Sequence, residues 1–433
     1  SSAGIGATVQ VALISNSVNA RVGHRNANAG ATTLHLSGPL SIRAKNRTET
    51  ESYVVVGAIG GTAGIGAQFS GIIVSNTVTA ELDNAHTTIS TATAEDGRVT
   101  VAAEESDAIN VVVGGLSGGG SAGVGAAVSL VTLKSSTAAQ IAGGSLTTPG
   151  AVDVMALSIR DVSPITVTAS LGGQVGIAGT VGVVLIGSGA TTDQMSVLNS
   201  GATQGDSSSG TLGNAGAASG TDVVGEVSGG VDGISAQSLN ANITAGEINI
   251  GAAAHTSVKN IVGALAVGLG GGGLGAGVGF TEVEQRVTAK TEGGTLTAPT
   301  IAIVASAGDR GSGRTAETLG AAGAGGLYVG LGAAVADSRV ENVILAELGS
   351  RTDSGGTNTG TISVTASDTS SMASYGYGFA GGAAAVGISL GFAQKSSQIS
   401  ARIADATVVT NFAGVAVVAS GGGSVSASTI AGA

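Results

Sequence analysis

The stretch AGIGAQFSGIIVSNTVTAEL, residues 63–82, decides the fold because apolar side chains recur in it at every second position. A period of two places alternate side chains on opposite faces of a β-strand, and branched apolar residues favour a strand over a helix. Related stretches occur seven times, beginning near residues 3, 63, 122, 175, 272, 329 and 384. We therefore expect a single elongated repeat array over residues 1–433.

A second segment accompanies each copy and has the form apolar-x-apolar-x-Ala, as in Val99-Thr100-Val101-Ala102-Ala103. Both segments alternate like strands and follow each other in the same order in every repeat. We therefore predict an all-β fold, a β-solenoid resembling a parallel β-helix, with about seven repeats of about 57 residues. Because that length exceeds one turn of most such coils, we expect two or three turns per repeat. A row of long antiparallel hairpins, joined at the glycine runs, is the alternative.

Two local predictions follow from the alternation. The apolar positions are odd-numbered at Ile65 and Phe69 but even-numbered at Val78 and Ala80, which predicts a bend or bulge at Ser75-Asn76-Thr77. The alanines that end the second segment, such as Ala103, Ala156 and Ala366, are expected to point inward. The acidic run Glu104, Glu105 and Asp107 is expected in an exposed turn, with the side chain of residue 105 pointing outward.

The fourth repeat is longer than the others, because the next copy begins 97 residues later instead of 53 to 60. The extra residues are rich in glycine, serine and alanine, and we interpret residues 201–240 as a low-complexity insertion. Insertions in solenoids lie at the surface, so this one is either a flap or a recognition element.

Composition and charge exclude several function classes. With 17 basic and 28 acidic residues the net charge is −11, which argues against nucleic acid as a partner. Cysteine is absent, which excludes disulfides and thiolate sites and is typical of exported proteins. Residues 261–280 are long enough for a membrane helix, but they are glycine-rich and align with the other repeats. We therefore expect no membrane insertion of this segment.

Catalytic or metal chemistry finds little support. The four histidines occupy no recurring position, and no nucleophile has a base beside it, so we expect no enzyme activity, cofactor or metal. A solenoid enzyme acting on polysaccharides would need carboxylates with lysine or arginine on one face. The alternating aromatic residues Tyr375, Tyr377 and Phe379 are the candidate ligand contacts, as a platform for sugar rings. Local core packing is the other interpretation.

Tandem copies of G-x-G-x-x-V, followed by Ser/Asn turns, A-x-I/L and V-x-V-x-A, resemble the repeat regions of large secreted bacterial filamentous adhesins, the haemagglutinin and leukotoxin-like families. The resemblance implies secretion to the bacterial cell surface and a part in cell adhesion or biofilms. The expected function is that of a rod-shaped, non-enzymatic stalk or fibre segment. Its expected partners are further copies, end to end or laterally, or a glycan or protein on a cell surface. A self-assembling extracellular matrix or filament subunit is the alternative, and a polysaccharide-modifying enzyme comes third.

Overall fold

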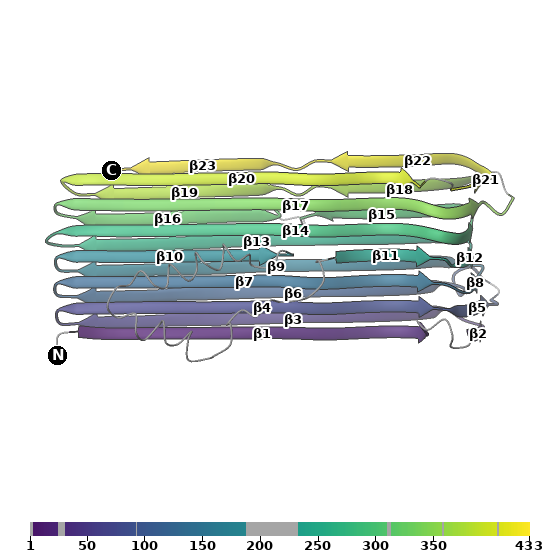
Figure 1. Ribbon diagram of the computed structural model, residues 1–433, viewed down its shortest axis with the longest axis horizontal. Coiled ribbons are helices and arrows are strands. Elements are labelled where there is room, and N and C mark those ends of the chain that lie inside the picture. The colour runs from purple at the N-terminus through teal and green to yellow at the C-terminus, as the bar shows by residue number, and fades with distance from the viewer. Residues whose placement is uncertain are drawn as a thin grey trace.

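The long strands form two sheets that face each other, and they run horizontally in Figure 1. The computed structural model describes residues 3–24, 31–91, 93–187, 233–309, 313–356, 359–404 and 407–433. These residues contain strands and no helix, and every strand pair is parallel. The predicted all-β parallel solenoid is confirmed, and the antiparallel hairpin alternative is wrong.

The first sheet contains the strands that carry the first sequence segment. Its long members are β1 (Ala3–Gly23), β4 (Ala63–Asp83), β7 (Ala122–Ala142), β10 (Val175–Ile186), β11 (Gly233–Leu239), β14 (Gly272–Thr297), β17 (Val329–Asp353) and β20 (Ala384–Ile403). Short strands continue it at one end, namely β2 (Thr32–Leu36), β5 (Ala85–Ile89), β8 (Ser145–Thr147), β12 (Asn242–Thr244) and β21 (Val409–Thr410).

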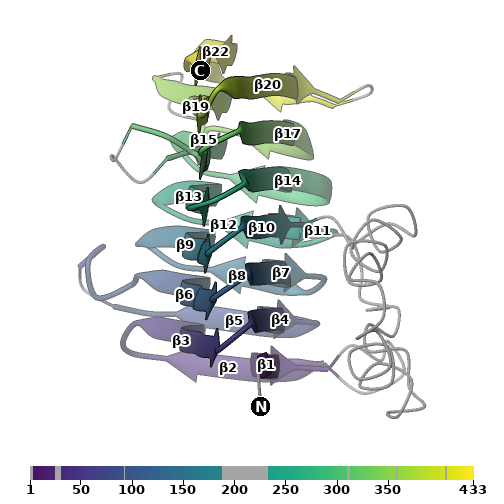
Figure 2. The same cartoon turned by 90° about the vertical axis from the view of Figure 1, so that its left-hand side faces the viewer.

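The second sheet contains the strands that carry the apolar-x-apolar-x-Ala segment and, in the last three rungs, the separate strands that follow it. They are β3 (Leu40–Gly60), β6 (Val99–Gly119), β9 (Ala151–Gly172), β13 (Glu247–Gly268), β15 (Thr300–Gly308), β16 (Ala316–Gly326), β18 (Gly360–Asp368), β19 (Met372–Gly381), β22 (Phe412–Gly421) and β23 (Val425–Gly432). Figure 2, seen along the strands, shows the two sheets as two columns.

Each repeat makes one turn of the solenoid, which we call a rung. Ile5 pairs with Ile65, and Ile65 pairs with Val124, so equivalent residues of consecutive repeats are neighbours in the ladder. The expectation of two or three turns per repeat is wrong because the strands are unusually long, with 21 residues in β4 and in β6. Two such strands with their connections use up the whole repeat.

The described molecule is a slab and not the expected rod. A 21-residue strand extends about 70 Å, whereas seven rungs stack to only about 34 Å. Figure 1 accordingly shows the longest axis along the strands. Most residues of a rung therefore extend the slab along the strands, and each rung adds little length along the solenoid axis.

The corners of each rung lie at the ends of the long strands and not at the predicted bend. Ser75, Asn76 and Thr77 continue β4 without a register shift against either neighbouring strand. The chain turns instead where residues adopt positive φ, at Asn84 (46°) and Asn240 (52°), at the glycine pair 143–144, and at the pair 293–294, where β14 continues through a register shift. Asparagine and glycine tolerate this backbone conformation best. The predicted bend at residues 75–77 is wrong, because the apolar residues before it point out of the slab.

The fourth repeat keeps its place in the ladder on both sides of its long segment. Ile186 at the end of β10 pairs with Leu133 of β7, and Gly233 at the start of β11 pairs with Ser136 of the same strand. Of the predicted insertion 201–240, residues 233–239 form β11, and residues 201–232 lie outside the described part of the chain. The two strands together occupy the position of one long strand.

Candidate interaction surface

The slab has two halves that differ in which face of the strands is apolar. We call the half that ends in the short strands β2, β5, β8, β12 and β21 the loop half. There the inward side chains are aliphatic, as at Val78, Ala80 and Leu82, and they form one core along all seven rungs. The predicted inward alanines Ala103 and Ala366 belong to this core and are confirmed. In the turn half, next to the two- or three-residue turns between the sheets, many inward positions carry glycine or other small residues, and large apolar side chains also point outward.

Glycine lines the interior of the turn half because the two sheets approach each other closely there. A Cβ atom on Gly64 would lie 2.1 Å from the carbonyl oxygen of Gly118, and one on Gly332 would lie 2.1 Å from that of Phe379. Contacts this short are impossible for real side chains, so an inward side chain has no space at these positions. The aliphatic core of the turn half is therefore confined to the part beside the polar layer, as at Ile72, Val74 and Val113, and only small alanines such as Ala264 and Ala266 are buried nearer the turns.

The outer face of the first sheet presents aliphatic and aromatic side chains over about nine residues of each strand. They are Ile5, Val9, Val11 and Leu13 of β1, Ile65, Phe69 and Ile73 of β4, Val124, Val128 and Leu130 of β7, Ile177, Val181 and Val183 of β10, Leu274, Val278 and Phe280 of β14, Leu331 and Val335 of β17, and Val386, Ile388, Leu390 and Phe392 of β20. Of these, Ile73, Leu130 and Val183 are covered and less than a tenth exposed. Beyond them the same face becomes polar, beginning with Ser75 in β4, Lys134 in β7 and Glu282 in β14.

The second sheet repeats this arrangement on the opposite face of the slab. Its outward residues in the turn half include Tyr53, Val55 and Ile59 of β3, Leu116 of β6, Ile165, Val167 and Leu171 of β9, Leu265 of β13, and Phe379 of β19, all more than a third exposed. We call the two apolar outer faces and the turns between them the apolar band.

Charged side chains lie at the edge of the apolar band, where Asp337 pairs in the ladder with Phe280 and Phe392 and the Arg339 guanidinium lies 5.3 Å from the centroid of the Phe280 ring. Each rung contributes a stretch without Asp, Glu, Lys or Arg that runs into the turn and out again. These stretches are residues 52–80, 108–133, 162–192, 260–281, 318–336 and 369–394. Exposed apolar patches on monomeric proteins seldom exceed a few hundred Å², so a band on both faces indicates a surface that contacts something else.

The candidate ligand contacts Tyr375, Tyr377 and Phe379 belong to this band. They alternate along β19 with inward Gly376 and Gly378, and Phe379 is 50% exposed. The guanidinium of Arg314 lies over the Tyr375 ring, 5.2 Å from its centroid. The core-packing interpretation is wrong, because the three rings point away from the interior. Ligand contact by these rings stays a prediction.

A buried polar layer crosses the interior near the middle of the strands. On the first sheet it consists of the buried residues Asn76, Ser135, Gln285 and Asn342 and the half-buried Ser397, which occupy equivalent positions in five rungs. Sequence reasoning placed this row at the expected bend, because the residues are typical of turns. The alternation of polar Asn76 with apolar Val74 and Val78 was the signal for an inward position.

Glu105 and Asp107 lie inside this layer, so the expected exposed turn is wrong. Asp107 is 1% exposed and accepts a hydrogen bond of 3.0 Å from Asn76 Nδ2, and Glu105 accepts one of 2.9 Å from Thr137 Oγ1. Burial and the neighbouring Glu105 raise the pKa of Asp107 to about 7, while Arg160 on the next rung opposes that rise.

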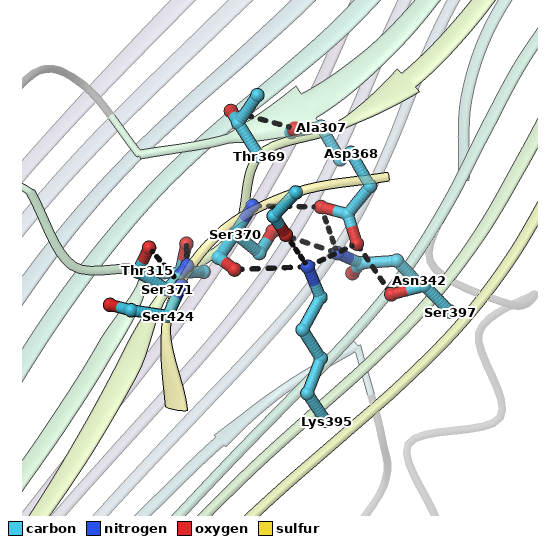
Figure 3. A network of polar contacts seen from close by, with 11 residues as sticks. Ala307, Thr315, Asn342, Asp368, Thr369, Ser370, Ser371, Lys395, Ser397 and Ser424 are labelled. Atoms are coloured by element: carbon cyan, nitrogen blue, oxygen red, sulfur yellow. Dashed lines mark hydrogen bonds and ion pairs between the residues drawn. The ribbon is translucent and has the colours of Figure 1, made fainter. Parts of the chain in front are cut away.

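Asp368 occupies a similar buried position but keeps its charge (Figure 3). Its carboxylate accepts hydrogen bonds from Asn342 Nδ2 at 3.2 Å and from Ser397, and it pairs with Lys395 Nζ at 3.1 Å. Burial alone would raise the pKa of Asp368, but the hydrogen bonds from Ser370, Ser397 and Lys395 outweigh it and hold the pKa below its ordinary value. The hydrogen-bond donors around Asp368 thus distinguish its site from that of Asp107, which lies beside the second carboxylate of Glu105.

The outer face of the loop half carries the charged side chains, many of which pair with the next rung. Arg21 Nε lies 2.5 Å from Glu81 Oε2, Lys45 Nζ lies 2.9 Å from Glu104 Oε1, and Arg98 Nε lies 2.6 Å from Asp153 Oδ2. A pocket of about 290 Å³ includes the Lys45–Glu104 pair in its lining. The Lys45–Glu104 ion pair links two neighbouring rungs, so its role is structural.

Two further expectations from the sequence concern a metal site and a membrane helix. In the described ranges, no group of three or more His, Asp or Glu residues lies close enough to hold a metal ion. Residues 261–280 form the end of β13, the turn and the start of β14. Among the described residues there is no helix long and apolar enough to cross a membrane.

Comparison with known proteins gave no match among protein-family models, curated proteins or solved structures.

Proposed function

We propose that this chain is a non-enzymatic structural segment of a secreted bacterial surface protein, a stalk or fibre segment of an adhesin. The observation that supports this most is the register of the long strands, which is kept from rung to rung except for one shift between β14 and β17 at Glu292/Thr295. Such a ladder is built by adding equal units, and its stability comes from nearest-neighbour contacts between rungs. The resemblance to filamentous adhesin repeats supports the same function.

The arrangement of charged groups favours a structural role over catalysis. Lys45 pairs with Glu104 of the adjacent rung, and Arg402 pairs with Glu347, with 2.5 Å between Nη2 and Oε2. A polysaccharide-modifying enzyme would instead need carboxylates and a basic residue aimed at a common substrate position. In this chain these basic and acidic side chains pair with each other along the solenoid axis instead.

Electron microscopy of the purified chain tests the proposal. A stalk segment should give separate particles whose longest dimension is about 70 Å, the length of a long strand. Long fibres built by the isolated chain would overturn it and favour the self-assembling filament subunit. Release of unsaturated sugar from polyuronate chains would favour the enzyme instead.

A further inference from the structure

We propose that the apolar band enters the hydrocarbon layer of a lipid bilayer, with the turns leading and the strands along the membrane normal. The solenoid axis would then lie parallel to the membrane. This inference rests on the proposed function and specifies a lipid bilayer as the surface that the protein contacts. It departs from the expectation that this segment does not enter a membrane. That expectation came from the sequence alone, in which the apolar residues of the turn half could not be assigned to the outer face.

The depth of the band matches a bilayer. On the first sheet the exposed outward apolar residues span about nine positions, as from Ile5 to Leu13 in β1 and from Ala384 to Phe392 in β20. Nine residues of β-strand extend about 30 Å, which is the thickness of the hydrocarbon core and the usual length of a membrane-spanning strand. Polar or charged residues follow at nearly the same depth on successive rungs.

The inside of the band suits lipid as well as the outside. Strands between the terminal rungs are hydrogen-bonded on both sides, as β7 is by β4 and by β10 and β11, so their backbone groups are satisfied within the sheet. A bilayer interior requires this of any backbone that enters it. At the two ends of the described stack, β1 pairs with β4 alone and β20 with β17 alone, so each has one open edge. The turns are short and rich in glycine, as at Gly60–Ala63 and Gly119–Ala122, and they carry no charge.

Lipid fits the band better than a second copy of the chain. One apolar face measures about 30 Å by 34 Å, or about 1,000 Å², which is enough for a protein interface. A dimer through that face would leave the opposite face and the turns exposed. A bilayer covers both faces and the turns at once, and the uncharged stretches continue around all three.

The experiment uses the absence of tryptophan from the chain. Leu116 and Ala102 both point outward from β6, but only Leu116, which is 66% exposed, lies in the band. In phosphatidylcholine vesicles, the fluorescence of Leu116→Trp should shift to shorter wavelength and be quenched by brominated acyl chains. The fluorescence of Ala102→Trp should remain unchanged.

Flotation with the same vesicles measures how much binding is lost when charges are placed inside the band, compared with charges placed outside it. Leu116 and Leu265 flank Ala169 in one outward column, and Ala102 and Gly251 flank Met155 in another. The double variant Leu116→Glu with Leu265→Glu should bind at least tenfold less protein to vesicles. The control, Ala102→Glu with Gly251→Glu, should bind like the unmodified chain, and circular dichroism verifies that both variants fold.

Three outcomes would overturn the proposal. They are absence of the unmodified chain from floated vesicles, equal responses of the two tryptophan variants, and a blue shift of Leu116→Trp that depends on protein concentration without lipid. The last would show that a second copy covers the band. None of these outcomes depends on fibres in the microscope, so the two proposals can fail separately.

Discussion

The loop half and the turn half are made by the same strands with opposite use of their two faces. In β4, Val78 and Leu82 fill the interior of the loop half, whereas Gly64 and Gly66 line the interior of the turn half and Ile65 points outward. Even-numbered residues of this strand point inward throughout. A change of apolar parity along a β-strand can therefore mark a change of environment around a straight strand, without any bend in the backbone.

Substituting glycine in the turn half should have the largest effect. Gly332→Ala places a Cβ against the carbonyl oxygen of Phe379 at 2.1 Å, whereas a Cβ on Gly179 meets nothing within 4 Å. We expect Gly332→Ala to lower the free energy of unfolding by about 3 kcal/mol and Gly179→Ala to raise it by up to about 0.5 kcal/mol. Chemical denaturation measures both, and similar midpoints for the two variants would refute the close approach of the sheets.

Enlarging an alanine tests the interior of the loop half. Ala103 is 1% exposed within the core, and Ala102 next to it points outward. Ala103→Leu should cost about 2 kcal/mol through overpacking, and Ala102→Leu should change little. Glu105 cannot serve as the outward control, because it is buried on the same face as Ala103. Thermal unfolding with limited proteolysis should show damage near β6, and equal midpoints for the two leucine variants would contradict the assignment of faces.

The boundary between the halves should respond to pH. Because the pKa of Asp107 is raised to about 7, the folded state binds its proton more tightly than the unfolded state. The free energy of unfolding should then fall as pH rises from about 4 to about 7, since ionisation destabilises the fold. Asp107→Asn should stabilise the protein by on the order of 1 to 2 kcal/mol at pH 8 and very little at pH 4. A benefit independent of pH would refute this explanation.

Removing an ion pair on the outer face of the loop half should have the smallest effect. Lys45 and Glu104 pair across two rungs, and their side chains are 61% and 37% exposed. Lys45→Ala should therefore cost no more than about 0.5 kcal/mol. A double-mutant cycle with Glu104→Ala measures the coupling between the two side chains, and a value above about 1 kcal/mol would contradict the prediction.

The sequence predicted the all-β solenoid, its seven repeats and the inward alanines, because these depend on alternation within a strand. It could not predict that one repeat makes one turn, since the pairing of Ile5 with Ile65 is a contact between distant residues. The apolar band was missed because Ile65 and Val78 are both apolar, and alternation alone does not say which of them is buried. Glu105 and Asp107 were misplaced because acidic residues seldom lie inside a protein without a partner.

The pairing of equivalent residues between rungs has a consequence for how such a chain can change in evolution. Ala63 pairs with Ala122, and Gly64 pairs with Gly123, so matching codons of neighbouring repeats encode matching positions in space. Unequal recombination between two copies therefore deletes or duplicates a complete turn while every remaining side chain stays on its own face. Genes for this architecture should accordingly vary in length by whole repeats.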